Sequence, residues 1–238
     1  MNSANRRVSE MTTRMIGFGG LTVEVFPAIS IGGQKFSTLN DLAGKFDLFG
    51  SREAQEKGAA KAATEAKAAL LIKILRQMKI IRETVLSAEG QQPGISQNFN
   101  MPASSSAESI IEAARAFVAA ATPLKPFFLS REMPEDFLEV LTDDIQSYED
   151  AVSNFNLHSA NRVAARTMLK DVCTQVLVTR RELDPIVRNK FRDDPEKLAM
   201  WEMASHLERP ATRGASATPG NGNQSPAGGN QPPEGGQA

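Results

Sequence analysis

The sequence predicts an all-α protein, folded as an elongated bundle of four or five helices of which two are long. Two stretches carry apolar residues at steps of three and four, the period of one face of an α-helix. Alternating strand patterns are nearly absent, since only LTVEVF at 21–26 alternates and a lone strand has no partner. The apolar stripes are Leu70, Ile74, Met78, Ile81 and Val85, and then Phe137, Leu141, Ile145, Tyr148, Val152 and Phe155.

Caps and helix breakers set the expected boundaries of five helices. Ser106 and Asp194 are the expected N-caps of the third and fifth helices, because their side-chain oxygens can accept a hydrogen bond from the first turn. The expected helices run from about Ser9 to Phe26, from Ser37 or Thr38 to Ala88, from Ser106 to before Pro123, from Pro134 to about Asn189, and over 195–207.

The two long helices each have a weak middle. Gly50, Ser51 and Gly58 interrupt the second helix, and the stretch NFNLHSAN at 154–161 interrupts the fourth. Residues of these types favour turns, so a tight turn between two antiparallel helices is the alternative at each place. We favour continuous but bent helices.

Apolar positions coincide when the sequence is shifted by 102 residues, as Phe26 does with Phe128 and Leu39 with Leu141. We interpret the match as an internal duplication, with pseudo-repeats at about 9–89 and 106–190, because it includes the loops as well as the helices. The alternative is that any two amphipathic helices can be slid into register.

The last residues differ in composition from the rest. From Pro210 onward the chain holds seven Gly, five Pro and no aromatic residue. Such a segment cannot bury enough apolar surface to offset its chain entropy. We therefore expect a helical body over 1–209 and a disordered tail over 210–238.

The overall charge is close to neutral, with 27 Lys and Arg against 28 Asp and Glu. This balance gives no general attraction to nucleic acid or to membranes. No uncharged apolar run approaches the ~20 residues of a membrane span. The single Cys173 cannot form an internal disulfide, so we expect a cytoplasmic protein.

No set of residues in the sequence converges on a catalytic, cofactor-binding or metal site. GGQKFST at 32–38 lacks the Gly that precedes Lys in a phosphate-binding loop. Glu202 and His206 could share a helix face as a solvated pair, but two ligands do not make a zinc site. His158 is expected to be exposed or capping, and Cys173 to be a small core residue. We expect no metal and no cofactor, and the sequence favours a non-enzymatic protein.

Charges of opposite sign gather in two separate stretches. Residues 57–82 carry seven Lys or Arg and one Glu, whereas 132–150 carry eight acidic residues and no basic one. One interpretation is that the two long helices are neighbours whose charges complement each other. The alternative is a nucleic-acid-binding face, although no aromatic residue alternates with the basic ones. The candidate interaction residues of this face are Lys61, Arg76, Lys79 and Arg82.

Trp201 is the only Trp of the chain and lies in the short closing helix. A single large aromatic on a terminal helix is suited to close the open end of a bundle, so we expect Trp201 to be a buried packing anchor rather than a ligand-stacking residue.

The stretch around Trp201, LDPIVRNKFRDDPEKLAMWEMASHLERP, resembles the C-terminal signature of a group of uncharacterised bacterial helical proteins. Residues 114–145, from ARAFVAAATPLKPFF to MPEDFLEVLTDDI, resemble the middle of those proteins. The resemblance implies an all-helical body and a variable polar tail, but it brings no activity, ligand or site residues.

The function predicted from the sequence is therefore a structural or protein-interaction helical bundle without enzymatic activity. We expect a protein partner or self-association. Nucleic-acid binding through the basic face of 57–82 is the alternative.

Overall fold

The computed structural model describes residues 3–90 and 93–208, and every regular element in these ranges is helical. This confirms the predicted all-α fold class. The predicted tail at 210–238 lies outside the described residues. The elements are α1 (Ser3–Leu21), α2 (Ile31–Leu86), the 3-10 helix η1 (Ile95–Asn98), α3 (Ala107–Ala121), the 3-10 helix η2 (Thr122–Leu124), α4 (Lys125–Leu129), α5 (Phe137–Lys190) and α6 (Pro195–Ser205).

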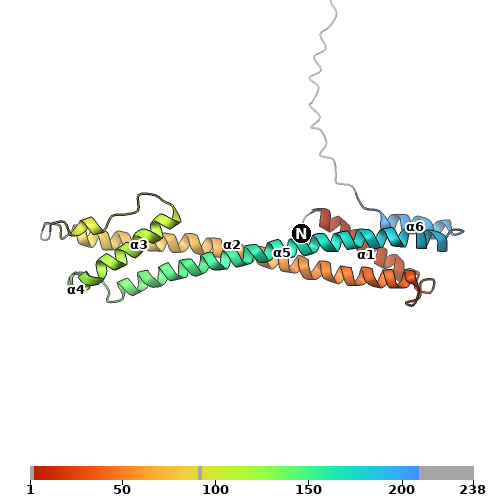
Figure 1. Cartoon of the computed structure of the whole chain (residues 1–238), viewed down its shortest axis with the longest axis horizontal. Coiled ribbons are helices and arrows are strands. Elements are labelled where there is room, and N and C mark those ends of the chain that lie inside the picture. Colours follow the sequence, from red (N-terminus) through yellow and green to blue (C-terminus); the bar gives the residue numbers. More distant parts are fainter. Residues whose placement is uncertain (1–2, 91–92, 209–238) are drawn as a thin grey trace, which may run out of the picture. The chain divides into compact units, whose positions relative to one another are not determined.

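The helices α2 and α5 are both continuous, with 56 and 54 residues, and they form an antiparallel pair (Figure 1). An ion pair joins Lys35 to Glu182 near one end of the pair, and another joins Lys73 to Asp144 towards the other end. The predicted continuity is confirmed. A Cβ atom added at Gly50 or Gly58 would meet no packed neighbour within 4 Å, so no close packing requires a Gly at either place.

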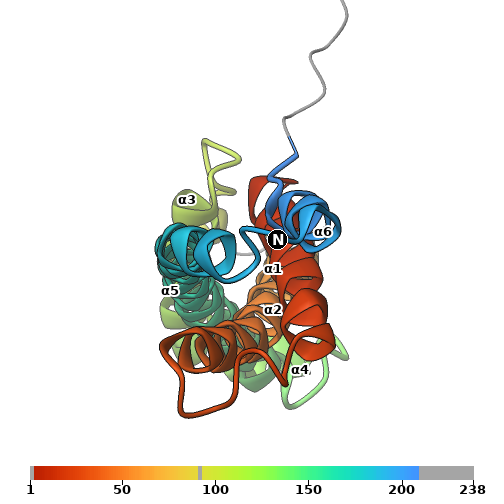
Figure 2. The same cartoon turned by 90° about the vertical axis from the view of Figure 1, so that its right-hand side faces the viewer.

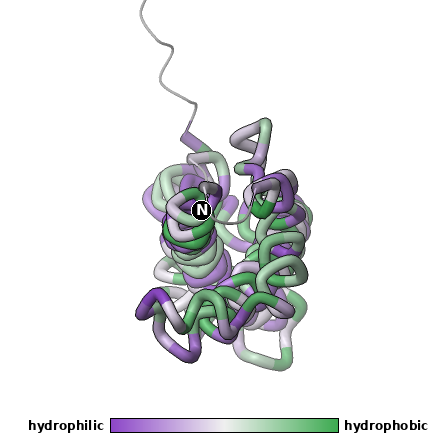
Figure 3. Tube along the Cα trace, turned by 90° about the vertical axis from the view of Figure 1, so that its left-hand side faces the viewer, coloured by the Kyte–Doolittle hydropathy of each residue, from purple (hydrophilic) through white to green (hydrophobic). Residues whose placement is uncertain are grey.

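Two hydrophobic cores lie along the α2–α5 pair. The first core, at the α1 end, brings α1 and α6 against the two long helices and includes Met15, Leu39 and Trp201 (Figure 2). The second core, at the α3 end, brings α3 against them and includes Met78, Phe99 and Phe117. Figure 3, which views the molecule from the α3 end, shows hydrophobic and hydrophilic residues interspersed along the helices.

Several predicted boundaries were wrong, because local hydrogen bonds end or start the helices elsewhere. The segment after α1 is a turn rather than a strand or more helix, since Thr22 O accepts from the backbone of Val25 and Phe26. Ser30 rather than Ser37 caps α2, and its Oγ accepts from Gly33 N at 3.0 Å. Pro134 precedes α5 without being part of it, after a turn in which Glu132 has a φ of 62°.

The predicted caps of the two shorter helices are confirmed. The side chain of Ser106 accepts from Ser109 N, and that of Asp194 accepts from Lys197 N. Helix α6 ends at Ser205, which is two residues before the expected end.

The order of elements repeats at the offset of 102 residues that the sequence suggested. Shifting α1 by this offset gives 105–123, which overlaps α3, and shifting α2 gives 133–188, which overlaps α5. Burial repeats as well, since Phe99 and Trp201 are both fully buried. We call two positions that differ by 102 equivalent. Further equivalent pairs with both members buried are Val8 and Ile110, Met15 and Phe117, Phe26 and Phe128, Leu39 and Leu141, Ile74 and Val176, and Ile81 and Leu183.

Candidate functional site

The predicted basic face lies on α2 and is engaged mainly with its own helix. Lys61 forms an ion pair with Glu65 at 3.6 Å, and Lys79 forms one with Glu83 at 3.7 Å. Arg76 is exposed and Arg82 is half-buried. None of these four side chains lines any of the four cavities described below.

The expected charge complementarity between 57–82 and 132–150 is mostly wrong. Helices α2 and α5 are neighbours, as predicted, but only Lys73 and Asp144 pair across these two stretches of the described chain. Glu139 pairs with Lys125 of α4, which lowers the pKa of that carboxyl, and Glu149 pairs with Arg115 of α3. The described ion pairs of the acidic stretch therefore join α5 to α3 and α4 more often than to α2.

Among the residues that the structure describes, Asp144 is one of two buried acidic side chains, and it lies between the long helices. Its carboxylate accepts hydrogen bonds from Lys73 Nζ at 2.7 Å and from Gln77 Nε2 at 2.8 Å. Its equivalent, Leu42, is also buried. Burying a carboxylate is costly unless it is paired, and both donors come from α2, so this contact fixes α5 in one register against α2.

The other buried acidic residue, Glu53, belongs to a polar cluster at the middle of the α2–α5 pair. Arg166 Nε donates to Glu53 Oε1 at 2.9 Å, and Arg162 Nε lies 3.9 Å from the same oxygen. One turn further along α2, Glu56 accepts from Asn161 at 3.3 Å and lies 2.7 Å from His158 Nδ1. The expectation of an exposed or capping His158 was wrong, because this side chain joins the two long helices.

A cavity of about 650 Å³ opens beside Glu53 between α1, α2 and α5. We call it the central basic cavity. Four of its lining side chains are cationic and one is acidic. Lys57 comes from α2, whereas Arg162, Arg166 and Lys170 come from α5 at steps of four and therefore share one helix face.

Large apolar side chains are exposed together at the α1 end. They belong to the last turn of α1, the turn that follows it, the start of α2 and α6. Figure 2 shows the ribbon of these elements at the α1 end. Each is at least 60% exposed. We call this set the apolar end surface; its members are Leu21, Val23, Ile29, Ile31 and Met203.

Two hollows border α1 at the apolar end surface. One of about 380 Å³ lies between α1 and α6 and is lined by Phe18, Leu21 and Met203 among others. The other, of about 290 Å³, lies between α1 and α2 and is lined by Val23 and Phe36 among others.

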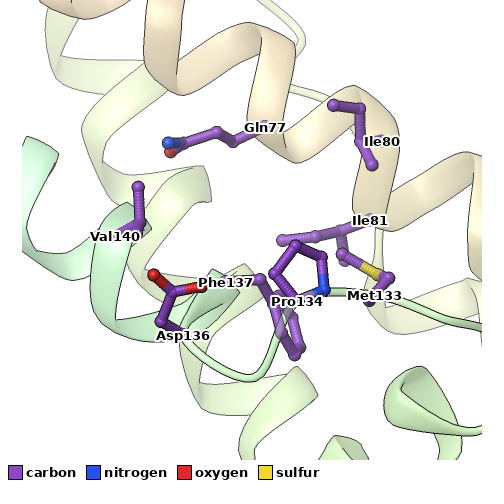
Figure 4. Close-up of a pocket in the computed structure, with 8 residues that line it drawn as sticks. All are labelled: Gln77, Ile80, Ile81, Met133, Pro134, Asp136, Phe137 and Val140. Atoms are coloured by element: carbon purple, nitrogen blue, oxygen red, sulfur yellow. The ribbon is translucent and has the colours of Figure 1, made fainter.

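A smaller apolar hollow of about 190 Å³ lies at the α3 end, between α2 and the start of α5 (Figure 4). Ile80, Ile81 and Phe137 line it, and so does Gln77, whose Oε1 is buried without a hydrogen-bond partner. The positions equivalent to Phe137 and Ile80 hold Lys35 and Glu182, which form an ion pair at 2.6 Å. At these equivalent positions the α3 end has an apolar hollow, whereas the α1 end has an ion pair.

Trp201 is fully buried, as predicted, and Nε1 donates to Asp184 Oδ1 at 3.0 Å. Burial by itself would raise the pKa of Asp184, but the hydrogen bond from Trp201 and the pairing with Arg188 lower it below its usual value. The predicted pair of Glu202 and His206 was wrong. Glu202 pairs with Arg188 at 3.2 Å, and His206 lies beyond the end of α6.

Cys173 is half-buried beside the first core, in line with its predicted packing role, and burial raises the pKa of its thiol. In the part of the chain that the structure describes, no group of three or more His, Cys, Asp or Glu side chains could hold a metal ion.

Sequence inspection missed the central polar cluster and the apolar end surface. The sequence offset of 102 could have indicated the central polar cluster, because Glu56 and His158 are 102 positions apart. If two equivalent helices pack antiparallel, equivalent positions meet only at their midpoint, so this contact could have been expected. The apolar residues around Phe26 could have indicated the apolar end surface, but they were assigned to the first predicted helix.

No family model matches the chain, and neither a curated protein nor a solved structure matches it. The resemblance to a group of helical proteins therefore stays a prediction. Within residues 3–90 and 93–208, no helix has both the length and the apolar character needed to cross a bilayer.

Proposed function

We propose that this chain is a non-enzymatic interaction protein, a helical bundle that binds a protein partner through its apolar end surface. The observation that carries the proposal is the joint exposure of Leu21, Val23, Ile29, Ile31 and Met203 at one end of the α2–α5 pair. Leu21 and Met203 line one hollow beside α1, and Val23 lines the other. Large exposed apolar side chains that gather on one part of a surface are typical of interaction sites.

The equivalent positions at the α3 end support this interpretation. Val23 and Ile29 are equivalent to Lys125 and Arg131, whose charged groups are engaged locally. Lys125 pairs with Glu139, and Arg131 lies over the ring of Phe127 at 3.8 Å. The α3 end therefore carries charges at these two positions, although its chain forms the short helix α4 where the α1 end forms a turn. The exposed apolar residues are thus not a feature that both ends share.

The two hollows beside α1 indicate the chemistry of the partner. Both have mainly apolar walls and lie on either side of one helix. Large aliphatic or aromatic side chains of a partner helix could fill them, as in helix-in-groove recognition. A second copy of the chain is one such partner. We place the interaction in the cytoplasm, consistent with the single half-buried thiol of Cys173.

The test is photo-crosslinking through residue 29, with residue 131 as the matched control. A photoreactive amino acid replaces Ile29 in one version of the full chain and Arg131 in the other. We expect a discrete cross-linked species through residue 29 alone, in cells or with purified chain if the partner is a second copy. The purified partner should then bind the chain directly, measured by sedimentation.

The variant Val23→Lys combined with Ile29→Arg places at the α1 end the residues that the α3 end already carries. We expect it to keep the melting temperature within a few degrees and to lose binding of that partner. Cross-linking that is equal through residues 29 and 131, or partner binding unchanged by the double variant, would overturn the proposal.

A further inference from the structure

The lining of the central basic cavity carries more positive than negative side chains. Arg162, Arg166 and Lys170 follow one another at steps of four on α5, and like charges at this spacing destabilise a helix. Lys57 faces the same space from α2. Glu53 is the single acidic residue among the lining side chains, and it already pairs with Arg166.

Helix packing does not explain these charges. The residues equivalent to Arg162, Arg166 and Lys170 are Ala60, Thr64 and Ala68 on α2. Glu53 and Lys57 are likewise equivalent to Phe155 and Ser159. On the other side of the polar cluster, α2 and α5 therefore pack with small and aromatic side chains at the equivalent positions. A cation on that side, Lys67, lies over the ring of Phe155 at 3.9 Å.

One donor within the cavity wall is also unsatisfied. Arg162 Nε is buried and has no hydrogen-bond partner, since its distance of 3.9 Å from Glu53 Oε1 is too long for a hydrogen bond. A buried unsatisfied donor on a charged group is costly. An anion in the cavity could accept from this guanidinium and would reduce the repulsion along α5.

From these three observations we infer that the central basic cavity binds a small ligand that carries a phosphate or diphosphate group. Four cations against one carboxylate leave three positive charges, which suits a multiply charged anion better than a single carboxylate. Guanidinium groups bind phosphate oxygens in a fixed geometry, and lysines add mobile charge. The volume of about 650 Å³ is that of a small-molecule site. This inference is independent of the apolar end surface.

The test is isothermal titration of the full chain with pyrophosphate, inorganic phosphate and acetate at physiological ionic strength. We expect pyrophosphate to bind with a dissociation constant below about 1 mM, phosphate to bind more weakly, and acetate not to bind. The chosen variant is Lys57→Gln combined with Lys170→Gln. Both lysines are exposed, and neither forms an ion pair with another described residue, so the fold should survive.

The matched control is Lys61→Gln combined with Lys79→Gln, which removes the same charge outside the cavity. We expect the cavity variant to bind pyrophosphate at least about tenfold more weakly, and the control to stay within about twofold of the unmodified chain. Melting temperatures of all three proteins show whether each is folded.

The inference is wrong if pyrophosphate does not bind, if acetate binds equally well, or if both double variants weaken binding to the same extent. A further titration uses a single-stranded oligonucleotide. If the oligonucleotide binds more tightly than pyrophosphate and the cavity variant loses this binding, the ligand of the cavity is a nucleic-acid backbone rather than a small molecule. That result would leave the apolar end surface untouched.

Discussion

His158 Nδ1 lies 2.7 Å from Glu56 Oε2, and the two residues are separated by 102 positions in the chain, the offset at which the helices and their buried residues repeat. In an antiparallel pair of equivalent helices, a position can meet its own equivalent only at the midpoint. This contact therefore marks the centre of the α2–α5 pair. The apolar end surface lies on one side of it and its charged counterpart on the other.

Replacing Trp201 tests the first core. Trp201→Ala should lower the free energy of unfolding by roughly 3–5 kcal/mol, because it removes a fully buried indole and leaves a cavity. The unmodified chain should show blue-shifted tryptophan emission. Met203→Ala, on the same helix but exposed, should change stability little, and the measurement is urea unfolding followed by circular dichroism. Equal effects of the two substitutions would contradict the assignment of Trp201 as the anchor.

The charge of Asp184 should stabilise the fold in a pH-dependent manner. Its pKa is lowered in the folded state, so the stabilisation is present above the usual carboxyl range, near pH 4, and is lost as the pH falls through the lower folded value. Asp184→Asn keeps an acceptor for Trp201 Nε1 but removes the charge. We expect the variant to be less stable than the unmodified chain at pH 7, with the difference narrowing below pH 4. A stability difference between the variant and the unmodified chain that grows below pH 4 would contradict a lowered pKa of Asp184.

Two glycines of α2 should respond to alanine in opposite directions. At Gly33 a Cβ atom would collide with the backbone carbonyl of Pro27, so Gly33→Ala should destabilise the start of the helix. Gly58 is exposed and has open space around it, so Gly58→Ala should stabilise the chain by about 0.5–1 kcal/mol. Thermal unfolding of both variants checks this. Destabilisation by Gly58→Ala would indicate a break in the middle of α2.

Truncating the buried side chain of Asp144 should lower the free energy of unfolding more than replacing it by an apolar side chain of similar size. Asp144→Ala leaves a void and removes the partner of Gln77, whereas Asp144→Leu introduces the residue found at the equivalent position, Leu42. We expect Asp144→Leu to be close to neutral and Asp144→Ala to lose about 1–3 kcal/mol. Denaturant titrations of the two variants make the comparison, and a larger loss for Asp144→Leu would show that the polar contact itself is required.

The basic face of 57–82 should have no specific affinity for nucleic acid at physiological salt. Lys61 and Lys79 already pair with Glu65 and Glu83, and Lys73 pairs with Asp144, so few of these charges are left to displace counterions from phosphates. The measurement is a titration with labelled duplex and single strands between about 50 and 200 mM salt. Micromolar binding with a steep salt dependence, abolished when Lys61, Arg76, Lys79 and Arg82 are changed to Glu, would favour the nucleic-acid alternative.

The features that the sequence predicted correctly depend on local patterns. Apolar spacing predicted α2 and α5, and the cap signals at Ser106 and Asp194 located the starts of α3 and α6. The start of α2 was placed too late, at Ser37 or Thr38, whereas Ser30 caps the helix and its first turn needs Gly33 beside Pro27.

The ion pairs could not be predicted from charge runs, because they depend on the register of α2 against α5. Glu53 pairs with Arg166, which lies in neither of the two charged stretches that the sequence emphasised. The central basic cavity was missed for the same reason. Its cations are spread over 57–170 and form a group only when the two long helices meet.

The two cores require very different amounts of the chain to have been synthesised. The second core draws its buried residues from Ile74 to Ile145, whereas the first draws them from Val8 to Ala204. A chain growing at about 10 residues per second therefore completes the second core several seconds before the first. During that interval α1 and the first half of α2 have left the ribosome without α6 to cover them. The earliest residues made are thus among the last to be buried, and the nascent chain exposes their apolar faces to chaperones or to other growing chains.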